Sequence, residues 1–344
     1  MSLESMKLGK PPMKIVLGTA SFGNPDSPFA TVHKVDSVVQ MIQTFRARGY
    51  CDVDTARAYP HGSLGSCENL LGHQDVGLKK WANVSSKVLS FVPGSHSQSK
   101  IDESIETSLI ALGVDCLDVL YLHGPDPTTP LLEVCRSVNK AYMQGKCHHF
   151  GLSNFSAHQV ENVVEICKEH GLLAPTIYQG QYNCLCRSAE DDLLPLLRRY
   201  KIAFWAYSPM AGGFLVDAIV RQAPASTHPR WMSNTRLGSC YRDFYVHPPV
   251  LTAVRNIQHA AVQHGVTAYA AALRWIIWHS SLAAEEGDGI VLGASNVAQL
   301  QENLDIIEQG PLEETLVAVI EIAWRHVLHS GKAPSYSLDI RKNL

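Results

Sequence analysis

The chain has 344 residues, of which 46% are hydrophobic and 18% charged, so it has enough apolar material for a large core and is not a disordered chain. Its 29 Lys and Arg against 32 Asp and Glu give a formal net charge of −3, which provides no basic surface for nucleic acid. No apolar run would span a membrane, and the N-terminus lacks a signal-peptide core. The nine scattered cysteines are typical of reduced thiols, so we expect a cytoplasmic protein with neither a membrane nor a nucleic-acid partner.

Short β-branched segments alternate with amphipathic segments along the whole chain. The expected strands are residues 15–18, 51–54, 83–87, 117–123, 149–153, 176–179, 203–207 and 289–292. Apolar residues recur at three- and four-residue spacing between them, which predicts helices that include 32–48, 101–112, 131–144, 157–169 and 192–200. Eight such units favour one α/β domain over residues 1–344, a single (β/α)8 TIM barrel, although the pattern alone leaves a doubly wound sheet open.

One segment departs from this rhythm. Residues 209–249, after the seventh strand, hold glycines, prolines and arginines with little periodicity. A loop of that length in a compact domain is usually functional, for example as a lid over a ligand. We therefore expect a long loop after strand 7, and a C-terminal helix followed by a non-helical tail after Ser330.

Titratable side chains of complementary type occur at successive strand ends, where barrel active sites gather. Asp54 and Tyr59 follow the second expected strand, Lys87 ends the third and His123 ends the fourth. A tyrosine is a poor acid near neutral pH unless a cation stabilises its phenolate, and an aspartate would hold that cation in place. Each residue alone is more often structural, but the four together predict a proton-transfer site.

Several motifs then resemble the aldo-keto reductase superfamily. They are DVDTARAYPHG with ENLLG (52–72), NVSSK (83–87), DVLYLHGPD (118–126), GLSNFS (151–156), YQGQYN (178–183), AYSPMAGGFL (206–215) and VLGASNVAQLQENL (291–304). They cover nearly the whole chain in the order that the family shows. The segments YLHGPDPTTPLLE and PTIYQGQYN are most similar to the aflatoxin-aldehyde-reductase branch.

The resemblance implies roles for the four strand-end residues. Four residues separate the family's aspartate from its catalytic tyrosine, which gives Asp54 and Tyr59 here, and its lysine and histidine match Lys87 and His123. In the family, a hydride passes from a reduced nicotinamide to a carbonyl carbon while the tyrosine protonates the oxygen. Lys87 and Asp54 would then lower the pKa of Tyr59, and His123 would hold the substrate.

The resemblance also implies a cofactor site for NADP. The matching positions are Ser153, Asn154 and Gln179 for the carboxamide, Tyr207 for stacking on the nicotinamide, Ser208, Pro209, Met210 and Gly212 for the pyrophosphate, and Gly293, Ser295, Gln299 and Asn303 at the start of a helix for the adenosine half. Amide groups at such a helix start suit a phosphate.

Two departures from the family pattern affect the choice between NADP and NAD. At the position of Gln299, many family members carry an arginine that pairs with the 2′-phosphate of NADP. Arg230 matches another position, where the aflatoxin-aldehyde-reductase branch supplies a compensating cation. The branch often has Gly-Lys where Val216 and Asp217 stand here, and a carboxylate facing the cofactor would repel phosphate. We expect NADPH to be preferred, with NADH as the alternative.

Other candidate signals are weaker. Tyr241 and Arg242 fall where the branch forms its substrate mouth, although an ordinary loop would explain them equally well. The Cys184–Cys186 and His148–His149 pairs have no partner at metal-ligand spacing, so no metal is expected.

The sequence therefore predicts an NADP-dependent oxidoreductase that reduces an aldehyde or ketone to an alcohol. The alternative is a nucleotide-binding regulatory or partner-binding protein on the same scaffold, like the potassium-channel β-subunits that also resemble this family. A metal-dependent hydrolase would need a His, Asp and Glu cluster that the sequence does not offer. The expected partner is a small carbonyl compound of unidentified structure, and assembly into a homodimer stays open.

Overall fold

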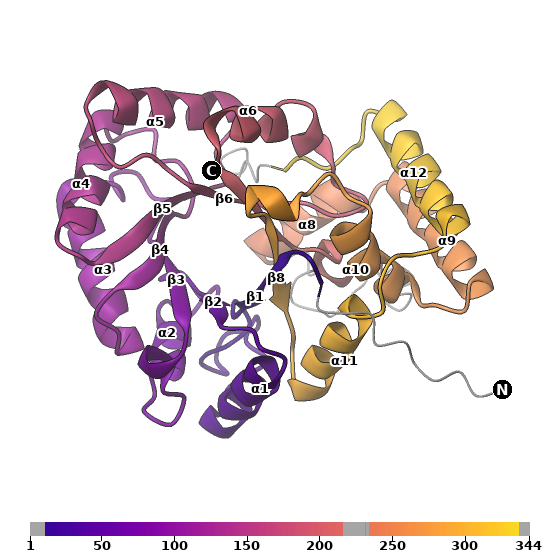
Figure 1. The fold of residues 1–344 in the computed structure, drawn as a ribbon, viewed down its shortest axis with the longest axis horizontal. Helices are drawn as coiled ribbons and strands as arrows, with labels where there is room; N and C mark the ends of the chain where they lie inside the picture. The colour runs from indigo at the N-terminus through magenta and orange to yellow at the C-terminus, as the bar shows by residue number, and fades with distance from the viewer. Residues whose placement is uncertain (1–10, 216–230, 232–233, 337–344) are drawn as a thin grey trace.

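The computed structural model describes residues 11–215, 231 and 234–336, and it confirms the predicted barrel. Eight parallel strands pair in chain order, and the last pairs with the first to close the sheet (Figure 1). They are β1 (Lys14–Gly18), β2 (Asp52–Asp54), β3 (Asn83–Val88), β4 (Leu117–Leu122), β5 (Cys147–Ser153), β6 (Ile177–Gln181), β7 (Ala203–Tyr207) and β8 (Gly289–Gly293). This closure excludes the doubly wound sheet that the sequence pattern left open.

Helices surround the strands. In the described part of the chain they are α1 (Val35–Ala47), α2 (Ser66–Leu71), α3 (Gln98–Leu112), α4 (Leu131–Met143), α5 (Ala157–Glu169), α6 (Leu193–Tyr200), α8 (Arg236–Tyr245), α9 (Pro248–Gln263), α10 (Ala268–Trp278), α11 (Val297–Ile307) and α12 (Glu314–His329). Consecutive helices from α1 to α6 contact one another, α10 contacts α11, and α11 contacts α1. Helices α9 and α12 pack together to one side of this ring (Figure 1).

Side chains alternate along each strand between the barrel interior and the helices, as the two-residue period of a strand requires. Val16 of β1 and Trp205 of β7 belong to the interior cluster, whereas Phe204 packs in the larger cluster between the sheet and the helices. Lys87 of β3 points into the interior, where its Nζ lies 5.6 Å from the centroid of the Tyr121 ring. The pleat thus places a charged side chain inside the barrel.

The segment 209–249, predicted as one long loop, is partly helical. It contains α8, and α9 begins at Pro248. The side chain of Thr235 caps α8 by accepting a hydrogen bond of 3.0 Å from the amide of Gly238. Tyr245 of α8 packs edge-on against Trp231, with ring centroids 6.0 Å apart. Leu237, Tyr241, Phe244 and Tyr245 recur at helical spacing and pack against the core, so α8 has an apolar face within this otherwise irregular segment. The described tail up to Tyr336 is non-helical, as predicted.

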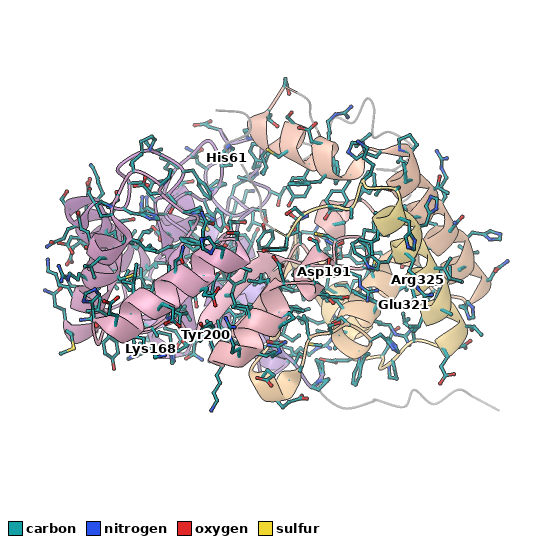
Figure 2. All side chains as sticks on the ribbon, turned by 90° about the horizontal axis from the view of Figure 1, so that it is seen from above. His61, Lys168, Asp191, Tyr200, Glu321 and Arg325 are labelled. Atoms are coloured by element: carbon teal, nitrogen blue, oxygen red, sulfur yellow. The ribbon has the colours of Figure 1, made fainter. Side chains whose placement is uncertain are left out.

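The carboxyl and amino ends of the strands lie at opposite ends of the barrel. Figure 2 shows His61 at one end of the molecule and Lys168 and Tyr200 towards the other. Lys168 lies in the last turn of α5 and Tyr200 ends α6, so both precede the amino ends of strands. His61 lies in the loop between β2 and α2, at the carboxyl ends of the strands.

No helix within the described ranges is both long and apolar enough to cross a membrane.

Candidate active site

A cavity of about 590 Å³ lies at the carboxyl ends of the strands. Most residues singled out from the sequence line it: Asp54, Tyr59, His123, Ser153, Asn154, Gln179, Tyr207, Ser208, Pro209, Met210, Gly212, Tyr241, Gly293, Ser295 and Gln299. Lys87 lies beneath the lining and is 1% exposed. Arg242 and Asn303 are not among the lining residues. The cavity extends from Asp54, Tyr59 and His123 at the strand ends to the segment between β8 and α11.

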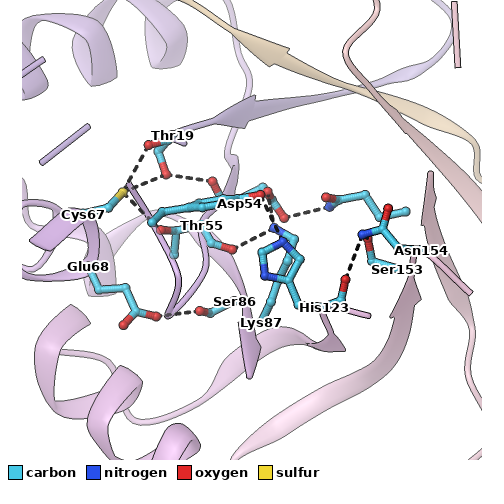
Figure 3. A network of polar contacts seen from close by, with 12 residues as sticks. Thr19, Asp54, Thr55, Cys67, Glu68, Ser86, Lys87, His123, Ser153 and Asn154 are labelled. Atoms are coloured by element: carbon cyan, nitrogen blue, oxygen red, sulfur yellow. Dashed lines mark hydrogen bonds and ion pairs between the residues drawn. The ribbon is translucent and has the colours of Figure 1, made fainter. Parts of the chain in front are cut away.

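A buried ion pair forms the floor of the cavity (Figure 3). The Nζ of Lys87 lies 2.6 Å from Oδ2 of Asp54, and it also donates to the carbonyl oxygen of Thr55 at 2.8 Å. The pairing of β2 with β3 brings the two side chains together, because each points inward from its own strand. Burial lowers the pKa of Lys87, and the Asp54 carboxylate opposes that shift. The carboxylate therefore favours the charged ammonium.

Tyr59 lies directly above this pair. The Nζ of Lys87 is 5.0 Å from the centroid of its ring, and its phenol oxygen is 3.5 Å from Nε2 of His123. A tight turn after β2 places the ring there, since the amide of Tyr59 donates to the carbonyl oxygen of Ala56 at 3.0 Å. A cation under the ring favours a phenolate, so this arrangement can donate and recover a proton.

His123 follows β4 and is held in its neutral form. Burial is the main cause that lowers the pKa of its imidazole well below the ordinary value, and the charge of Lys87 acts in the same direction. Its Nδ1 is buried without a hydrogen-bond partner among the described residues. A neutral imidazole carries one N–H donor, which suits it to bond a carbonyl oxygen.

The ends of β5, β6 and β7 meet the predicted catalytic residues through side-chain hydrogen bonds. Asn154 donates to the carbonyl oxygen of His123 at 2.8 Å, and the Tyr207 hydroxyl donates to Oδ1 of Asn154 at 2.8 Å. Gln179, in the middle of β6, donates to Oδ1 of Asp54 at 2.8 Å. These bonds connect predicted cofactor residues to His123 and Asp54, two of the four predicted catalytic residues.

The loop after β7 turns sharply along the cavity wall. Ser208 and Gly212 both have positive φ angles, 52° and 64°. The hydroxyl groups of Ser208 and Tyr241 lie 2.9 Å apart, which ties the loop to α8. Pro209 and Met210 continue the lining beside them. This irregular backbone leaves polar groups next to the cavity.

The segment between β8 and α11 forms the far end. The amide of Ser295 donates to Oε1 of Gln299 at 2.7 Å, and Asn303 donates to the carbonyl oxygen of Gly293 at 3.2 Å. The hydroxyl of Tyr269 donates to Asn303. A Cβ added to Gly293 would meet nothing within 4 Å, so the glycine leaves open space at the amino end of an eleven-residue helix. Helix amino ends attract phosphate.

A second buried ion pair, which sequence reasoning missed, braces the loop that carries Tyr59. Arg57 pairs with the fully buried Glu68 of α2, and Ser86 of β3 donates to Glu68 at 2.6 Å. The amide of Arg57 also donates to the carbonyl oxygen of Lys87 at 3.1 Å. The glutamate in ENLLG, in the first turn of a short helix, is the signal that could have revealed it.

Other lining residues were also missed. Tyr269 of α10 and Phe91 after β3 line the cavity. Phe91 follows Lys87 by four residues and could have been found as a strand-end aromatic residue. No comparable signal marks Tyr269, because it reaches the cavity only through the packing of α10 against α11.

Some predicted positions lie elsewhere. Arg230, Val216 and Asp217 fall outside the described residues. Among the described residues, no group of three or more His, Cys, Asp or Glu side chains could hold a metal ion.

A model described as the Aldo/keto reductase family matches residues 14–325. An oxidoreductase of Leptosphaeria maculans, sirO, is 37% identical over 331 residues, which cover 94% of this chain and 97% of that protein. An aldo-keto reductase of Pseudocercospora fijiensis is 36% identical over 297 residues, covering 86% and 100%. Aflatoxin B1 aldehyde reductase member 2 of Mus musculus is 33% identical over 330 residues, covering 93% and 86%.

Proposed function

The chain belongs to the aldo/keto reductase family and is an oxidoreductase on a TIM barrel, and from this premise we propose that it reduces an aldehyde or ketone to an alcohol with NADPH. The observation that carries the proposal is the stack of three groups at the cavity floor. The Asp54 carboxylate holds the Lys87 ammonium at 2.6 Å, and that ammonium lies 5.0 Å from the ring centroid of Tyr59.

Tyr59 acts as the general acid in this proposal. Its hydroxyl lines the cavity and transfers its proton to the carbonyl oxygen of the substrate. Lys87 makes this transfer easier because it stabilises the phenolate that remains, and Asp54 keeps Lys87 in position. A positioned acid of this kind typically contributes about 10²- to 10⁴-fold in rate.

His123 orients the substrate. Its Nε2 and the Tyr59 hydroxyl oxygen are 3.5 Å apart, so one carbonyl oxygen beside both atoms could accept a hydrogen bond from each. The imidazole is neutral because burial lowers its pKa. A neutral ring donates one hydrogen bond without competing with Tyr59 as the proton source, which separates the two roles.

The residues around the cavity fit a nicotinamide dinucleotide. Ser153, Asn154 and Gln179 supply polar groups for a carboxamide, and the Tyr207 ring offers a face for stacking. The loop of residues 208–212 would hold the pyrophosphate, and the open space at Gly293 with the amino end of α11 would receive the adenosine half. When bound, the reduced cofactor supplies the hydride that ends on the carbonyl carbon.

The preference for NADPH over NADH rests on Arg230. Gln299 offers only a neutral amide, and its Oε1 already accepts the Ser295 amide at 2.7 Å. A guanidinium is better suited to a 2′-phosphate because it is charged and presents a fork of donors.

The test is to mix the purified protein with NADPH and a panel of aldehydes and ketones and to follow the loss of NADPH absorbance. We expect oxidation that depends on both the carbonyl compound and the protein. If NADPH binds tightly but no compound on a broad panel is reduced, the reductase proposal is wrong and a nucleotide-binding partner protein becomes the better reading.

A further inference from the structure

We propose that Tyr121 of β4 is a positioning residue whose ring holds the Lys87 ammonium under Tyr59, an inference that rests on the reductase function proposed above. The Nζ of Lys87 lies 5.0 Å from the ring centroid of Tyr59 and 5.6 Å from the ring centroid of Tyr121. Tyr59 lines the cavity, whereas Tyr121 is fully buried and is not among the lining residues. The ammonium therefore lies over two aromatic rings, one at the cavity and one inside the barrel.

The pairing of three strands determines where the Tyr121 ring lies. Lys87 of β3 pairs with Tyr121 of β4, and Tyr121 pairs with Gly151 of β5. Paired residues of neighbouring strands point to the same face of a sheet, so the lysine and the tyrosine both enter the barrel interior. A Cβ added at Gly151 would come within 2.3 Å of the Tyr121 ring. The absence of a side chain at Gly151 thus leaves the space that the ring occupies.

The Tyr121 ring can stabilise a charge in the barrel interior. Burial lowers the pKa of Lys87, because an ammonium without water around it needs other partners. The face of an aromatic ring attracts a cation, and the attraction is stronger where water is excluded. Asp54 supplies an opposite charge at 2.6 Å, and Tyr121 adds the ring without adding a second charge that would compete for the ammonium.

The hydroxyl of Tyr121 does not take part in this role. It is buried without a hydrogen-bond partner among the described residues. Burial is the main cause that raises the pKa of Tyr121 well above its ordinary value, so this phenol keeps its proton and does not compete with Tyr59 as the acid. A role that depends on the ring alone predicts that phenylalanine can replace Tyr121 and that leucine cannot.

The other titratable groups around the ammonium stay in place when only the ring is changed. They are Asp54 of β2, Cys67 and Glu68 of α2, and His123 after β4. The two carboxylates raise the pKa of Lys87. Burial keeps the thiol and the imidazole uncharged, since it raises the pKa of one to about 12 and lowers that of the other. A change in the ionisation of Tyr59 on substitution of Tyr121 therefore reports the loss of the ring.

The experiment compares wild type with Tyr121→Leu and Tyr121→Phe, and Tyr121→Met replaces the leucine variant if that protein does not fold. Tyr178→Leu is the matched control, because Tyr178 of β6 is equally buried but stacks on Phe204, between the sheet and the helices. The ionisation of Tyr59 is followed by ultraviolet difference absorbance without cofactor, and Tyr59→Phe in each background assigns the signal. The kcat and KM for one aldehyde are measured in parallel.

We expect Tyr121→Leu to shift the ionisation of Tyr59 to higher pH by roughly one unit, since an ammonium that is held less firmly stabilises the phenolate less. The kcat at neutral pH should fall roughly tenfold with little change in KM, because Tyr59 becomes a weaker acid. Tyr121→Phe and Tyr178→Leu should both behave as wild type.

An unchanged ionisation of Tyr59 in folded Tyr121→Leu or Tyr121→Met would overturn the role of Tyr121. The same shift in Tyr178→Leu, or in Tyr121→Phe, would also overturn it, because the effect would then not belong to the ring. If wild type reduces no aldehyde at all, the reductase proposal fails, and the ionisation of Tyr59 still decides whether Tyr121 holds the ammonium in place.

Discussion

The side-chain amide of Gln179 on β6 donates a hydrogen bond of 2.8 Å to Oδ1 of Asp54 on β2, across the interior of the barrel. Asp54 thus uses one oxygen for Gln179 and the other for Lys87. Family resemblance assigns Gln179 to the cofactor, but this bond also gives it a part in positioning the ion pair. The residue therefore connects the proposed cofactor half of the cavity with the proposed proton-donor half.

Replacing Gln179 with leucine should therefore lower kcat at saturating NADPH by roughly ten- to a hundredfold, because hydrogen bonds to charged groups contribute about 1.5–3 kcal/mol each. Gln181→Leu is the matched control, since Gln181 lies on the same strand but bonds the Tyr245 hydroxyl. A rise in KM for NADPH with no change in kcat would show that Gln179 acts on the cofactor alone.

Lys87→Met should lower turnover and change the pH–rate profile. In the proposed mechanism the Lys87 ammonium stabilises the Tyr59 phenolate, so its removal should shift the basic limb of the profile to higher pH, towards the pKa of an ordinary phenol. Lys146→Met, on the surface beside Glu106, serves as the control. A profile identical to wild type in a folded Lys87→Met protein would remove Lys87 from the mechanism.

Stability should fall in mild acid because of His96. Its side chain is buried and lies 2.8 Å from the Ser90 hydroxyl, and burial lowers its pKa to about 4. The unfolded chain binds this proton near pH 6.5, so the stabilising contribution is present above that pH and is lost as pH falls towards 4. The loss should reach roughly 3 kcal/mol.

Chemical denaturation at several pH values between 6.5 and 4 measures this loss of stability. His96→Gln should flatten the dependence. If the slope of the unfolding free energy against pH is the same in His96→Gln as in wild type, another group is responsible.

Arg230→Ala should weaken NADPH binding by about ten- to a hundredfold and leave NADH nearly unaffected, since only NADPH carries the 2′-phosphate. Fluorescence titration of both cofactors measures the difference. Equal weakening of the two would mean that Arg230 contacts the shared part of the dinucleotide. No weakening of either would move the phosphate contact towards Ser295, or indicate NADH as the cofactor.

The sequence predicted the strands well, because their apolar segments are short and well separated. The fifth expected strand, residues 149–153, falls within Cys147–Ser153. The fourth was expected over residues 117–123 but ends at Leu122, so His123 follows the strand instead of ending it. Helix α8 was missed although Leu237, Tyr241 and Phe244 recur at helical spacing, because the surrounding glycines and prolines favour a loop. Tyr241 and Tyr245, one turn apart on this face, stack with ring centroids 6.3 Å apart.

Most residues predicted for the site line one cavity, but the sequence did not predict their contacts with one another. Motifs placed Asp54, Lys87 and Gln179 in one site, yet the bond between Asp54 and Gln179 joins residues 125 positions apart. It depends on how closely opposite strands approach when the barrel closes, and spacing along the chain does not reveal that distance. The burial of Glu68 under the Tyr59 loop depends in the same way on packing.

The most direct test of the proposed mechanism is the rate of carbonyl reduction by Tyr59→Phe, measured in a single turnover beside the Kd for NADPH. The substitution removes one hydroxyl group and keeps the ring above Lys87. We expect a rate about 10²- to 10⁴-fold below wild type with NADPH affinity largely intact. A Tyr59→Phe enzyme that reduces the same aldehyde at a near wild-type rate would contradict the assignment of Tyr59 as the general acid.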